Sequence, residues 1–438
     1  PPRSTLFPYT TLFRSRCDPP VPDPLSLMTF RCAFFLAFLI CPAVLPAADW
    51  PWWRGPERNG VAGADAEPPQ EFGLKAGIRW SVDLPGRGHG SACVVGGRVF
   101  IATADEETQI QAMHGFDRAS GKLLWTTPIH EQGHTQKINK KASWASVTPA
   151  CDGERVYINF LTGDAVFTTA LDLDGKRVWQ TKITDYVEHQ GYGSSPAIHG
   201  DLVIVSADNK GPSGGAVCGL DRKTGEVVWR HARPTLPNYP SPVILEAAGR
   251  TQLFLTGADK VTSLDPLTGK VNWEIDGATT ECVTSTPTDG VRIFCSGGYP
   301  KNHVAAIAAD GSGKVEWETK DRVYVPSMLV KDGHLYATLD GGIELCLESA
   351  TGKEKWKGRL GGTFSASPVL VGDRIHAVNE SGDYFIFKAD PAGLEILAQN
   401  KVGDEVYASP SICGKEIYLR VAFYEGEKRN EKLVCFAE

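Results

Sequence analysis

The chain consists of short apolar stretches separated by polar turns. The stretches at 155–158, 202–205 and 334–337 alternate or are rich in β-branched side chains, and a turn with Asp and Gly precedes each of them. This pattern is typical of short β-strands joined by tight turns. The sequence therefore predicts an all-β fold built from many antiparallel strands.

One group of strands recurs along the chain. Its clearest copy, residues 115–125, has an aromatic-Asp step, a Ser-Gly-Lys turn and a final Trp. A Ser-Pro or Ser-x-Pro step precedes the first strand of most copies. A period of roughly 40–50 residues with four short strands per copy is typical of a β-propeller.

The number of copies predicts the number of blades. Trp, or Leu in its place, ends the repeat at Trp80, Trp125, Trp179, Trp229, Trp273, Trp317, Trp356 and Leu397. The last copy stops at a third strand, 433–436, whereas 75–80 is a fourth strand without the first three. We therefore expect eight four-stranded antiparallel blades, with the N-terminal strand completing the last blade and closing the ring.

The first 48 residues predict processing rather than fold. Residues 28–48 hold a short basic start, an apolar run and small residues, which predicts a signal peptide and a periplasmic or secreted protein. The apolar run is too short for a membrane span, so no transmembrane segment is expected after its removal. Residues 1–27 resemble translated adapter sequence, and we expect them to be foreign. A Trp- and Pro-rich segment, 49–74, then precedes the propeller at 75–438.

Composition and charge exclude some partners. A hydrophobic content of 42% is enough for a large core, and the formal charge of −7 is mildly acidic. An acidic surface argues against nucleic acid and against anionic membranes as partners. We expect a monomer.

The recurring Trp, Asp and Thr residues are interpreted as structural. One Trp per blade at a fixed position suits packing between adjacent blades, with the indole N–H donated to backbone. The Asp and Thr side chains are expected to bond within their own turn.

Aromatic residues mark the candidate binding site. Six blades carry one just before their first strand, namely Trp144, Tyr192, Tyr239, Tyr324, Phe364 and Tyr407. His89 and Val283 occupy this place in the other two blades. In a propeller this position lies near the mouth of the central channel, so the side chains are expected to converge on a recognition surface. The alternative is that they only cap the inner strands.

No catalytic residue and no metal site are predicted. His130 and His134 have the spacing of two zinc ligands, but no third ligand accompanies them. A nucleophilic Cys with an activating base and a Gly-x-Ser-x-Gly turn are both missing from the sequence. Cys282 and Cys295 flank a turn, and a disulfide between them stays open because spacing alone does not establish its geometry.

The repeat resembles that of the pyrroloquinoline-quinone-like (PQQ-like) β-propellers over roughly residues 75–438. That family includes quinoprotein dehydrogenases and the BamB type of propeller lipoprotein, and most members bind no quinone. The resemblance to the dehydrogenases implies adjacent cysteines, a calcium ion and a catalytic Asp. This sequence has no Cys-Cys pair and no matching acidic set. We therefore expect no cofactor, with PQQ and calcium as the alternative.

The sequence favours a non-catalytic, exported scaffold that binds a protein or peptide. One alternative is a propeller oxidoreductase, dependent on PQQ or not. Another is saccharide binding at the channel-mouth aromatics.

Overall fold

The computed structural model describes residues 49–134 and 137–438. The expectations for residues 1–27 and 28–48 lie outside these residues. All regular elements of the described residues are β-strands. Within that part of the chain there is no helix long and apolar enough to cross a membrane.

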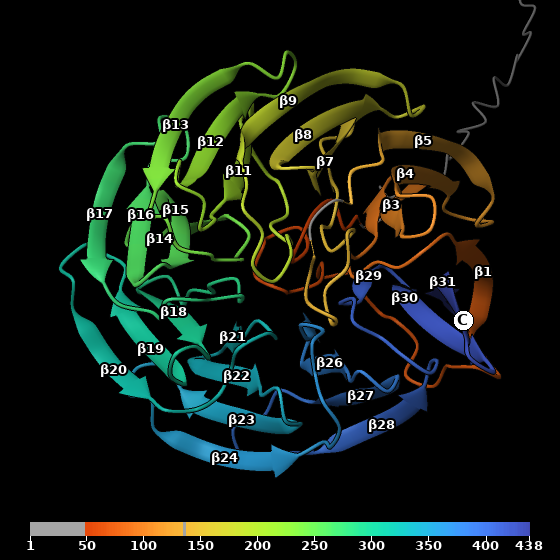
Figure 1. The fold of residues 1–438 in the computed structure, drawn as a ribbon. Coiled ribbons are helices and arrows are strands. Elements are labelled where there is room, and N and C mark those ends of the chain that lie inside the picture. Colours follow the sequence, from red (N-terminus) through yellow and green to blue (C-terminus); the bar gives the residue numbers. More distant parts are fainter. Residues whose placement is uncertain (1–48, 135–136) are drawn as a thin grey trace, which may run out of the picture. The chain divides into compact units, whose positions relative to one another are not determined.

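The strands form eight small antiparallel sheets arranged as a ring (Figure 1). Each sheet is one blade, and in all but the eighth its strands are hydrogen-bonded in sequence from the channel to the rim. The first four blades contain β2(Cys93–Val95), β3(Arg98–Asp105), β4(Ile110–Asp117) and β5(Leu123–Glu131); β6(Ala150–Cys151), β7(Arg155–Thr162), β8(Ala165–Asp172) and β9(Arg177–Asp185); β10(Ala197–His199), β11(Leu202–Ala207), β12(Gly215–Asp221) and β13(Val227–Arg233); and β14(Val243–Ala247), β15(Arg250–Gly257), β16(Lys260–Leu264) and β17(Val271–Asp276).

The other four blades complete the ring. They contain β18(Arg292–Gly297), β19(His303–Ala308) and β20(Val315–Thr319); β21(Leu329–Lys331), β22(His334–Thr338), β23(Ile343–Glu348) and β24(Glu354–Arg359); β25(Val369–Val371), β26(Arg374–Val378), β27(Asp383–Lys388) and β28(Ile396–Lys401); and β29(Ser411–Cys413), β30(Glu416–Glu425) and β31(Lys428–Phe436) with β1(Ile78–Leu84). The all-β, eight-bladed propeller predicted from the sequence is confirmed.

Ring closure follows the predicted scheme. Strand β1 pairs antiparallel with β31, and Trp80 lies opposite Cys435. The eighth sheet has the order β1-β31-β30-β29, so the strand from the N-terminal side is its outermost member.

Blade five differs from the expectation of four strands. Its sheet has three strands, and the inner strand is reduced to a single bridge between Thr288 and Ile293. The turn at Asp289 begins one residue after Thr288, and the Asp289 carboxylate accepts the N–H groups of Val291 and Arg292 at 3.1 and 2.7 Å. Too few residues therefore remain between Pro287 and this turn for a regular strand.

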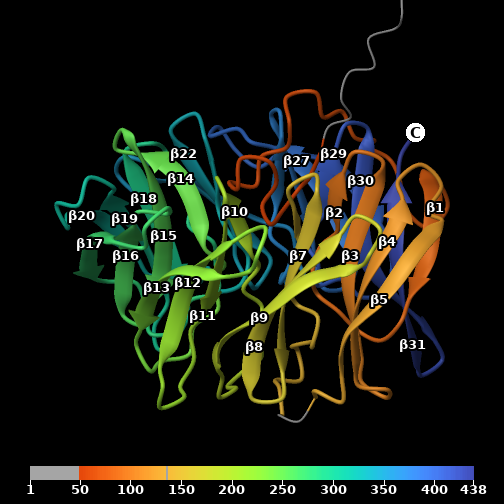
Figure 2. The same cartoon turned by 90° about the horizontal axis from the view of Figure 1, so that it is seen from above.

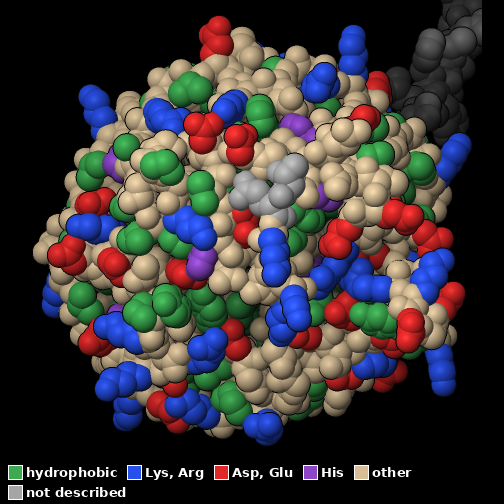
Figure 3. Space-filling view, in the orientation of Figure 1, with side chains coloured by type: hydrophobic (Ala, Val, Ile, Leu, Met, Phe, Trp, Pro, Cys, Tyr) green, Lys and Arg blue, Asp and Glu red, His purple; other side chains and the backbone are tan. Residues whose placement is uncertain are grey.

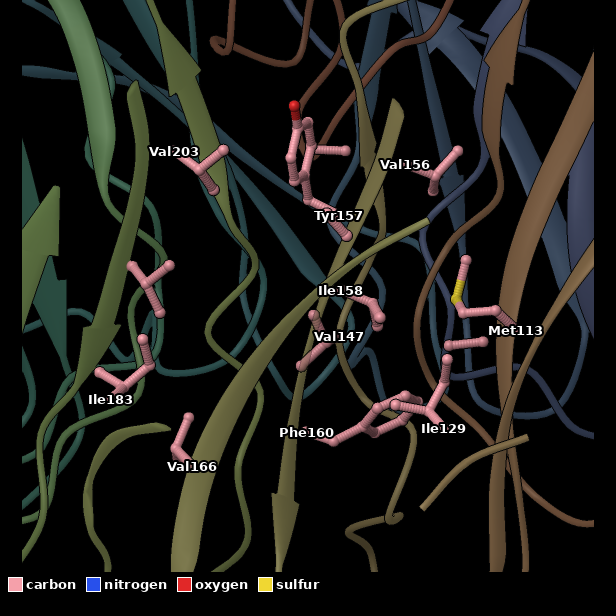
Figure 4. Close-up of a cluster of buried hydrophobic side chains, with 14 of the residues drawn as sticks. Met113, Ile129, Val147, Val156, Tyr157, Ile158, Phe160, Val166, Ile183 and Val203 are labelled. Atoms are coloured by element: carbon pink, nitrogen blue, oxygen red, sulfur yellow. The ribbon is translucent and has the colours of Figure 1, made fainter. Parts of the chain in front are cut away.

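The core lies between neighbouring blades. Figure 4 shows one cluster, in which Met113 of β4, Val156 and Ile158 of β7 and Val203 of β11 belong to three blades. Burying apolar side chains between sheets in this way supplies the main stabilisation of the fold.

The repeat Trp residues join blades as predicted. Indole N–H groups donate to backbone carbonyls of the next blade, as from Trp80 to Arg118 at 2.9 Å and from Trp125 to Leu173 at 2.8 Å. Trp179, Trp317 and Trp356 do the same. Blades three and four are different. The buried indole N–H of Trp229 has no hydrogen-bond partner among the described residues, and the indole of Trp273 donates to the Gln252 side chain, whose amide donates in turn to Ala309.

The motif Asp residues bond within their own turns, as expected. The Asp221 carboxylate accepts the N–H groups of Lys223 and Thr224 at 2.9 and 2.8 Å. In the next repeat Asp265 accepts both the N–H and the hydroxyl of Thr268.

The structure has no disulfide between Cys282 and Cys295. Cys282 and Cys295 are both free and buried. The Cys282 sulfur faces Thr279, whereas that of Cys295 faces the Ala305 carbonyl of the neighbouring strand β19.

An ion pair between buried groups strengthens the closing seam. Arg420 of β30 pairs with Glu431 of β31, and both side chains are at most 2% exposed. Arg420 also donates to the carbonyl of Ala102 in blade one, at 2.7 Å. Glu431 accepts the N–H of Gly88, which precedes blade one, at 3.0 Å. The eighth blade is therefore tied to the first by hydrogen bonds to both charged groups.

Candidate functional site

The segment before the propeller forms a floor across the channel. Trp50 pairs with Val94 of blade one, and the Pro51 carbonyl accepts the N–H of Cys151 in blade two at 2.8 Å. Further along, Val61 forms a parallel bridge with Leu370 of blade seven. In Figure 2 this segment, drawn in red, lies at the upper face of the ring.

Two side chains of the segment extend the floor to other blades. The Arg54 guanidinium is 3% exposed and donates to the carbonyls of Met328 and Pro368, at 2.9 and 2.8 Å, which lie in blades six and seven. Trp53 donates its indole N–H to the Ser285 hydroxyl of blade five at 2.8 Å. The floor is therefore fixed by contacts on opposite sides of the ring.

A belt of hydroxyl groups surrounds the channel just above this floor. The N–H of Ser327 donates to the Ser367 hydroxyl at 2.9 Å, and the N–H of Ser367 donates to the Ser409 hydroxyl at 2.8 Å. The same bond joins Ser91 to Thr148, Thr148 to Ser195, Ser195 to Ser241, and Ser285 to Ser327. Each bond runs from one blade to the next, so these residues, most of which belong to Ser-Pro or Thr-Pro steps, hold the inner strands together.

A cavity of about 570 Å³ occupies the channel above the belt. Trp53 and five of the belt serines line it, and so do Asn139 and Lys141 from the connection between blades one and two. That connection reaches the face opposite the N-terminal segment (Figure 2). The cavity is therefore a cup that is closed at one face by residues 50–62 and has its mouth at the other.

Six of the seven predicted site residues line this cup, namely His89, Tyr192, Tyr239, Tyr324, Phe364 and Tyr407. Phe364 is 1% exposed and Tyr192 is 8% exposed, so both serve mainly as wall packing. His89, Tyr239, Tyr324 and Tyr407 are half-buried and present more of their surface to the cavity. A role of these residues in binding stays a prediction.

Trp144 is not among the residues that line the cup. Its ring stacks on His134, with centroids 4.6 Å apart and planes 4° apart. The side chain packs in the blade-two core with Val147 and Phe160. The irregular segment before the inner strand turns this ring away from the channel, which the sequence pattern does not reveal.

An acidic group lies behind one wall of the cup, because Glu281 contacts the wall residue Tyr324 but does not itself line the cavity. The hydroxyl of Tyr324 donates to Glu281 at 3.4 Å, and His189 lies 3.3 Å from the other oxygen of Glu281. Burial and the Glu281 charge raise the pKa of both Tyr324 and Tyr239. The Tyr239 hydroxyl is buried and has no hydrogen-bond partner within the described part of the chain.

On the opposite wall His89 and Tyr407 line the cavity, and a basic group, Arg87, lies behind them. His89 stacks on Tyr407 with ring centroids 4.4 Å apart, and the Arg87 guanidinium carbon lies 5.4 Å from the Tyr407 centroid. Burial, followed by the charges of Arg87 and Arg420, holds the pKa of His89 well below its usual value, so the imidazole is neutral at pH 7. The buried Nε2 of His89 has no partner among the described residues.

Charged residues span the mouth. Lys141 forms an ion pair with Glu380 of blade seven at 2.8 Å, and Asn139 donates to Gln190 at 2.7 Å. Asp340 accepts the N–H of Tyr324 at 2.9 Å, and burial raises the pKa of its carboxyl. Figure 3 shows Lys and Arg side chains around the middle of this face. Both carboxylates that line the cup are therefore already engaged.

The residues present do not match a calcium and quinone site. Across residues 49–134 and 137–438, no three His, Cys, Asp or Glu side chains lie together as a metal site. The cysteines of these residues are buried, and none of them lines the cup. Of the carboxylates on its wall, Glu380 is paired with Lys141 and Asp340 holds the Tyr324 backbone.

The belt serines, Trp53 and the residues of the mouth were missed by the sequence prediction. A signal for the belt was present, because Ser or Thr precedes Pro in most repeats. The bonds join residues about one repeat apart, so inspection of a single repeat does not reveal them.

Fold and site together define a propeller of the PQQ-like class with a one-ended central cup. The family model described as "Outer membrane protein assembly factor BamB" matches residues 75–188, 113–358 and 300–397. These ranges cover more than half of the chain, so the chain belongs to this family.

Known proteins of two kinds are similar to it. The outer membrane protein assembly factor BamB of Bordetella pertussis (strain Tohama I) is 23% identical over 77% of this chain and 82% of its own length. A polyvinylalcohol dehydrogenase of a Pseudomonas species is 24% identical over 45% of this chain and 35% of its own length. The solved europium-containing methanol dehydrogenase superposes with a TM-score of 0.63 at 12% identity, covering 89% of this chain and 98% of the other. At that identity the likeness is one of fold.

Proposed function

We propose that the protein is an exported, non-catalytic scaffold that binds protein or peptide partners. The relative from Bordetella pertussis is named an assembly factor, which agrees with a role in bringing proteins together. Export is supported by the signal-peptide pattern at 28–48.

Exposed apolar side chains on the outer strands carry the proposal, and within the described residues every blade except blade six has at least one, including Ile78, Val271, Val315 and Ile396. Leu123 and Leu124 of β5, Val178 of β9, and Val227 and Val228 of β13 are all at least 44% exposed. Each of these strands is the edge of its sheet. An edge strand with exposed apolar residues is a template for pairing with another chain. The equivalent strand of blade six, β24, instead carries Glu354 and Lys355 before its Trp.

The competing function is that of an oxidoreductase, as in the polyvinylalcohol dehydrogenase relative. We propose that this chain works without quinone, because its cup offers no free acidic set for calcium. Reconstitution with PQQ and calcium, followed by dye-linked alcohol oxidation, tests this alternative. Turnover above that of the untreated protein would establish the enzyme.

Site-directed photo-crosslinking tests the scaffold. A photoreactive phenylalanine analogue replaces Leu124 or Val228 in cells that naturally make the protein. We expect a crosslinked species of higher mass that contains a second protein. Lys355 is the matched control, because it occupies the position before Trp in blade six and is exposed. Equal crosslinking at all three positions, or none at Leu124 and Val228, would contradict the proposal.

A further inference from the structure

The floor of the cup carries hydroxyl protons that the fold does not use. Ser195, Ser241, Ser327, Ser367 and Ser409 line the cavity and are each at most 7% exposed. In the belt each hydroxyl accepts a backbone N–H from the preceding blade. A hydroxyl has one proton to donate besides its two acceptor positions. Within the described residues these five protons have no acceptor in the hydrogen-bond network.

Other groups on the walls add to this surplus of donors. The buried Tyr239 hydroxyl has no partner among the described residues. Arg322 lines the cup, with its guanidinium carbon 5.3 Å from the Tyr324 ring centroid. The available acceptors are fewer, because Glu380 is held by Lys141 and Ser365, and one oxygen of Asp340 is held by the Tyr324 N–H. The cup is therefore suited to a ligand rich in acceptor atoms.

The charge and shape of the cup narrow the choice of ligand. Hydroxyl donors from several blades line the floor of the cup, which suits an oxyanion. No Lys or Arg belongs to the belt itself, so a doubly charged phosphate would lack counter-charge there. A neutral sugar needs acceptors as well as donors, and the acceptors that remain in the cup are mainly the second lone pairs of the belt hydroxyls, which are weaker acceptors than a carboxylate. A carboxylate, with one charge and two acceptor oxygens, fits this pattern best.

We propose that the floor of the cup binds the terminal carboxylate of a peptide. The side chain of the peptide's last residue is held against Tyr239, Tyr324 and Tyr407. The belt serines and Tyr239 donate to the carboxylate oxygens, and the aromatic wall supplies apolar contact. Trp53 and the floor segment stop the chain from passing through, so a chain end is favoured over an internal loop. A volume of about 570 Å³ gives room for a short peptide end. This inference rests on the proposed recognition of protein partners and names the group that is recognised.

Two matched peptides test the inference. Both are N-terminally fluorescein-labelled Gly-Ser-Gly-Ser-Tyr-Leu; one ends in a free carboxylate and the other in an amide. Fluorescence anisotropy with the full chain at pH 7 should show at least tenfold tighter binding of the free acid. Sodium benzoate should displace it, whereas maltose should not. Equal affinity for acid and amide would overturn the inference, and displacement by maltose alone would assign the cup to a neutral sugar.

Variants test whether the preference for the free acid over the amide depends on the floor of the cup. The triple variant Ser327→Ala, Ser367→Ala, Ser409→Ala should bind the acid no better than the amide. The matching Ser→Thr triple variant should keep the preference, because Thr148 already serves as a belt member. Tyr239→Phe removes one donor without touching the belt and should weaken acid binding several-fold, even if the alanine variant fails to fold. Loss of binding in the threonine variant, or no change in Tyr239→Phe, would contradict the assignment.

The peptide and crosslinking experiments fail independently. If neither peptide binds while Leu124 and Val228 still crosslink, the carboxylate inference fails and the scaffold proposal stands. If the free acid binds with the predicted preference and no crosslink forms, the outer-strand proposal fails instead.

Discussion

Gly175 lies against the indole of Trp125, the outer-strand residue of the preceding blade. A Cβ on Gly175 would lie 2.5 Å from Cδ2 of that ring, and the Gly175 backbone has a φ of 84°. The glycine of the repeat turn is therefore needed twice, for its backbone conformation and for the space that the Trp requires. The same contact recurs between Gly121 and Trp80.

We expect Gly175→Ala to lower the free energy of unfolding by about 2–4 kcal/mol, from backbone strain and overpacking together. Gly153→Ala is the matched control, because Gly153 has a φ of 88° and nothing within 4 Å of its Cβ position. Gly153→Ala should lower the free energy of unfolding only through backbone strain, by about 1 kcal/mol. Urea unfolding measures both, and equal losses would show that contact with Trp125 is unimportant.

The seam between blades eight and one should depend on its buried ion pair. Replacing one partner, as in Glu431→Gln, leaves Arg420 buried without its counter-charge and should cost about 3–5 kcal/mol. Glu395→Gln is the control, because its pair with Lys388 is half exposed and should be worth less than about 1 kcal/mol. Thermal unfolding of both variants provides the comparison, and a Tm for Glu431→Gln close to that of the control would refute the role of the pair.

Glu344 should make stability depend on pH. Its side chain is fully buried in β23, and burial raises the pKa of its carboxyl to about 8. The native state therefore keeps a proton that the unfolded chain loses above its own pKa of about 4.5, so this contribution to stability declines as pH rises from there to about 8.

The variant Glu344→Gln has an amide that does not titrate, so it lacks this dependence of stability on pH. The free energy of unfolding of this variant minus that of the natural protein should therefore rise by roughly 1.4 kcal/mol for each pH unit across this window. Below pH 4 the difference between the two should be constant. Urea unfolding at pH 4, 5, 6, 7 and 8 measures it, and a difference that is flat with pH would mean that Glu344 titrates normally.

Arg54 should be irreplaceable by lysine. Its guanidinium reaches carbonyls in two different blades from a fully buried position, and burial lowers its pKa to about 9. A lysine has one nitrogen and cannot reproduce this fork, so Arg54→Lys should cost about 2 kcal/mol. Arg250→Lys, at an exposed position, should change stability by less than about 0.5 kcal/mol. If both variants unfold at the same urea concentration, the floor is not held by this fork.

The sequence predicted those features of the fold that repeat. The fixed distance from the Asp step to Trp gave eight blades, and the unmatched strands at the two ends predicted the pairing of Trp80 with Cys435. Each strand is recognised from residues close together in one repeat, and the count of repeats then shows which two strands lack partners.

Features without a period were predicted less well. Trp144 and Tyr239 both precede an inner strand, yet Trp144 packs into the core while Tyr239 lines the cup. The direction of a side chain in an irregular segment depends on packing against distant residues, such as His134 for Trp144. The path of 49–62 across the channel is likewise fixed by contacts hundreds of residues away, such as that of Arg54 with Pro368.

The pairing of β1 with β31 has a consequence for how the protein is made. Because β1 comes before every other strand of the ring and β31 comes after them, β1 has no sheet partner until β31 is available. A prematurely terminated product would carry seven finished modules and two bare β-edges, a form that invites aggregation. The ring therefore closes only after β31 has been added.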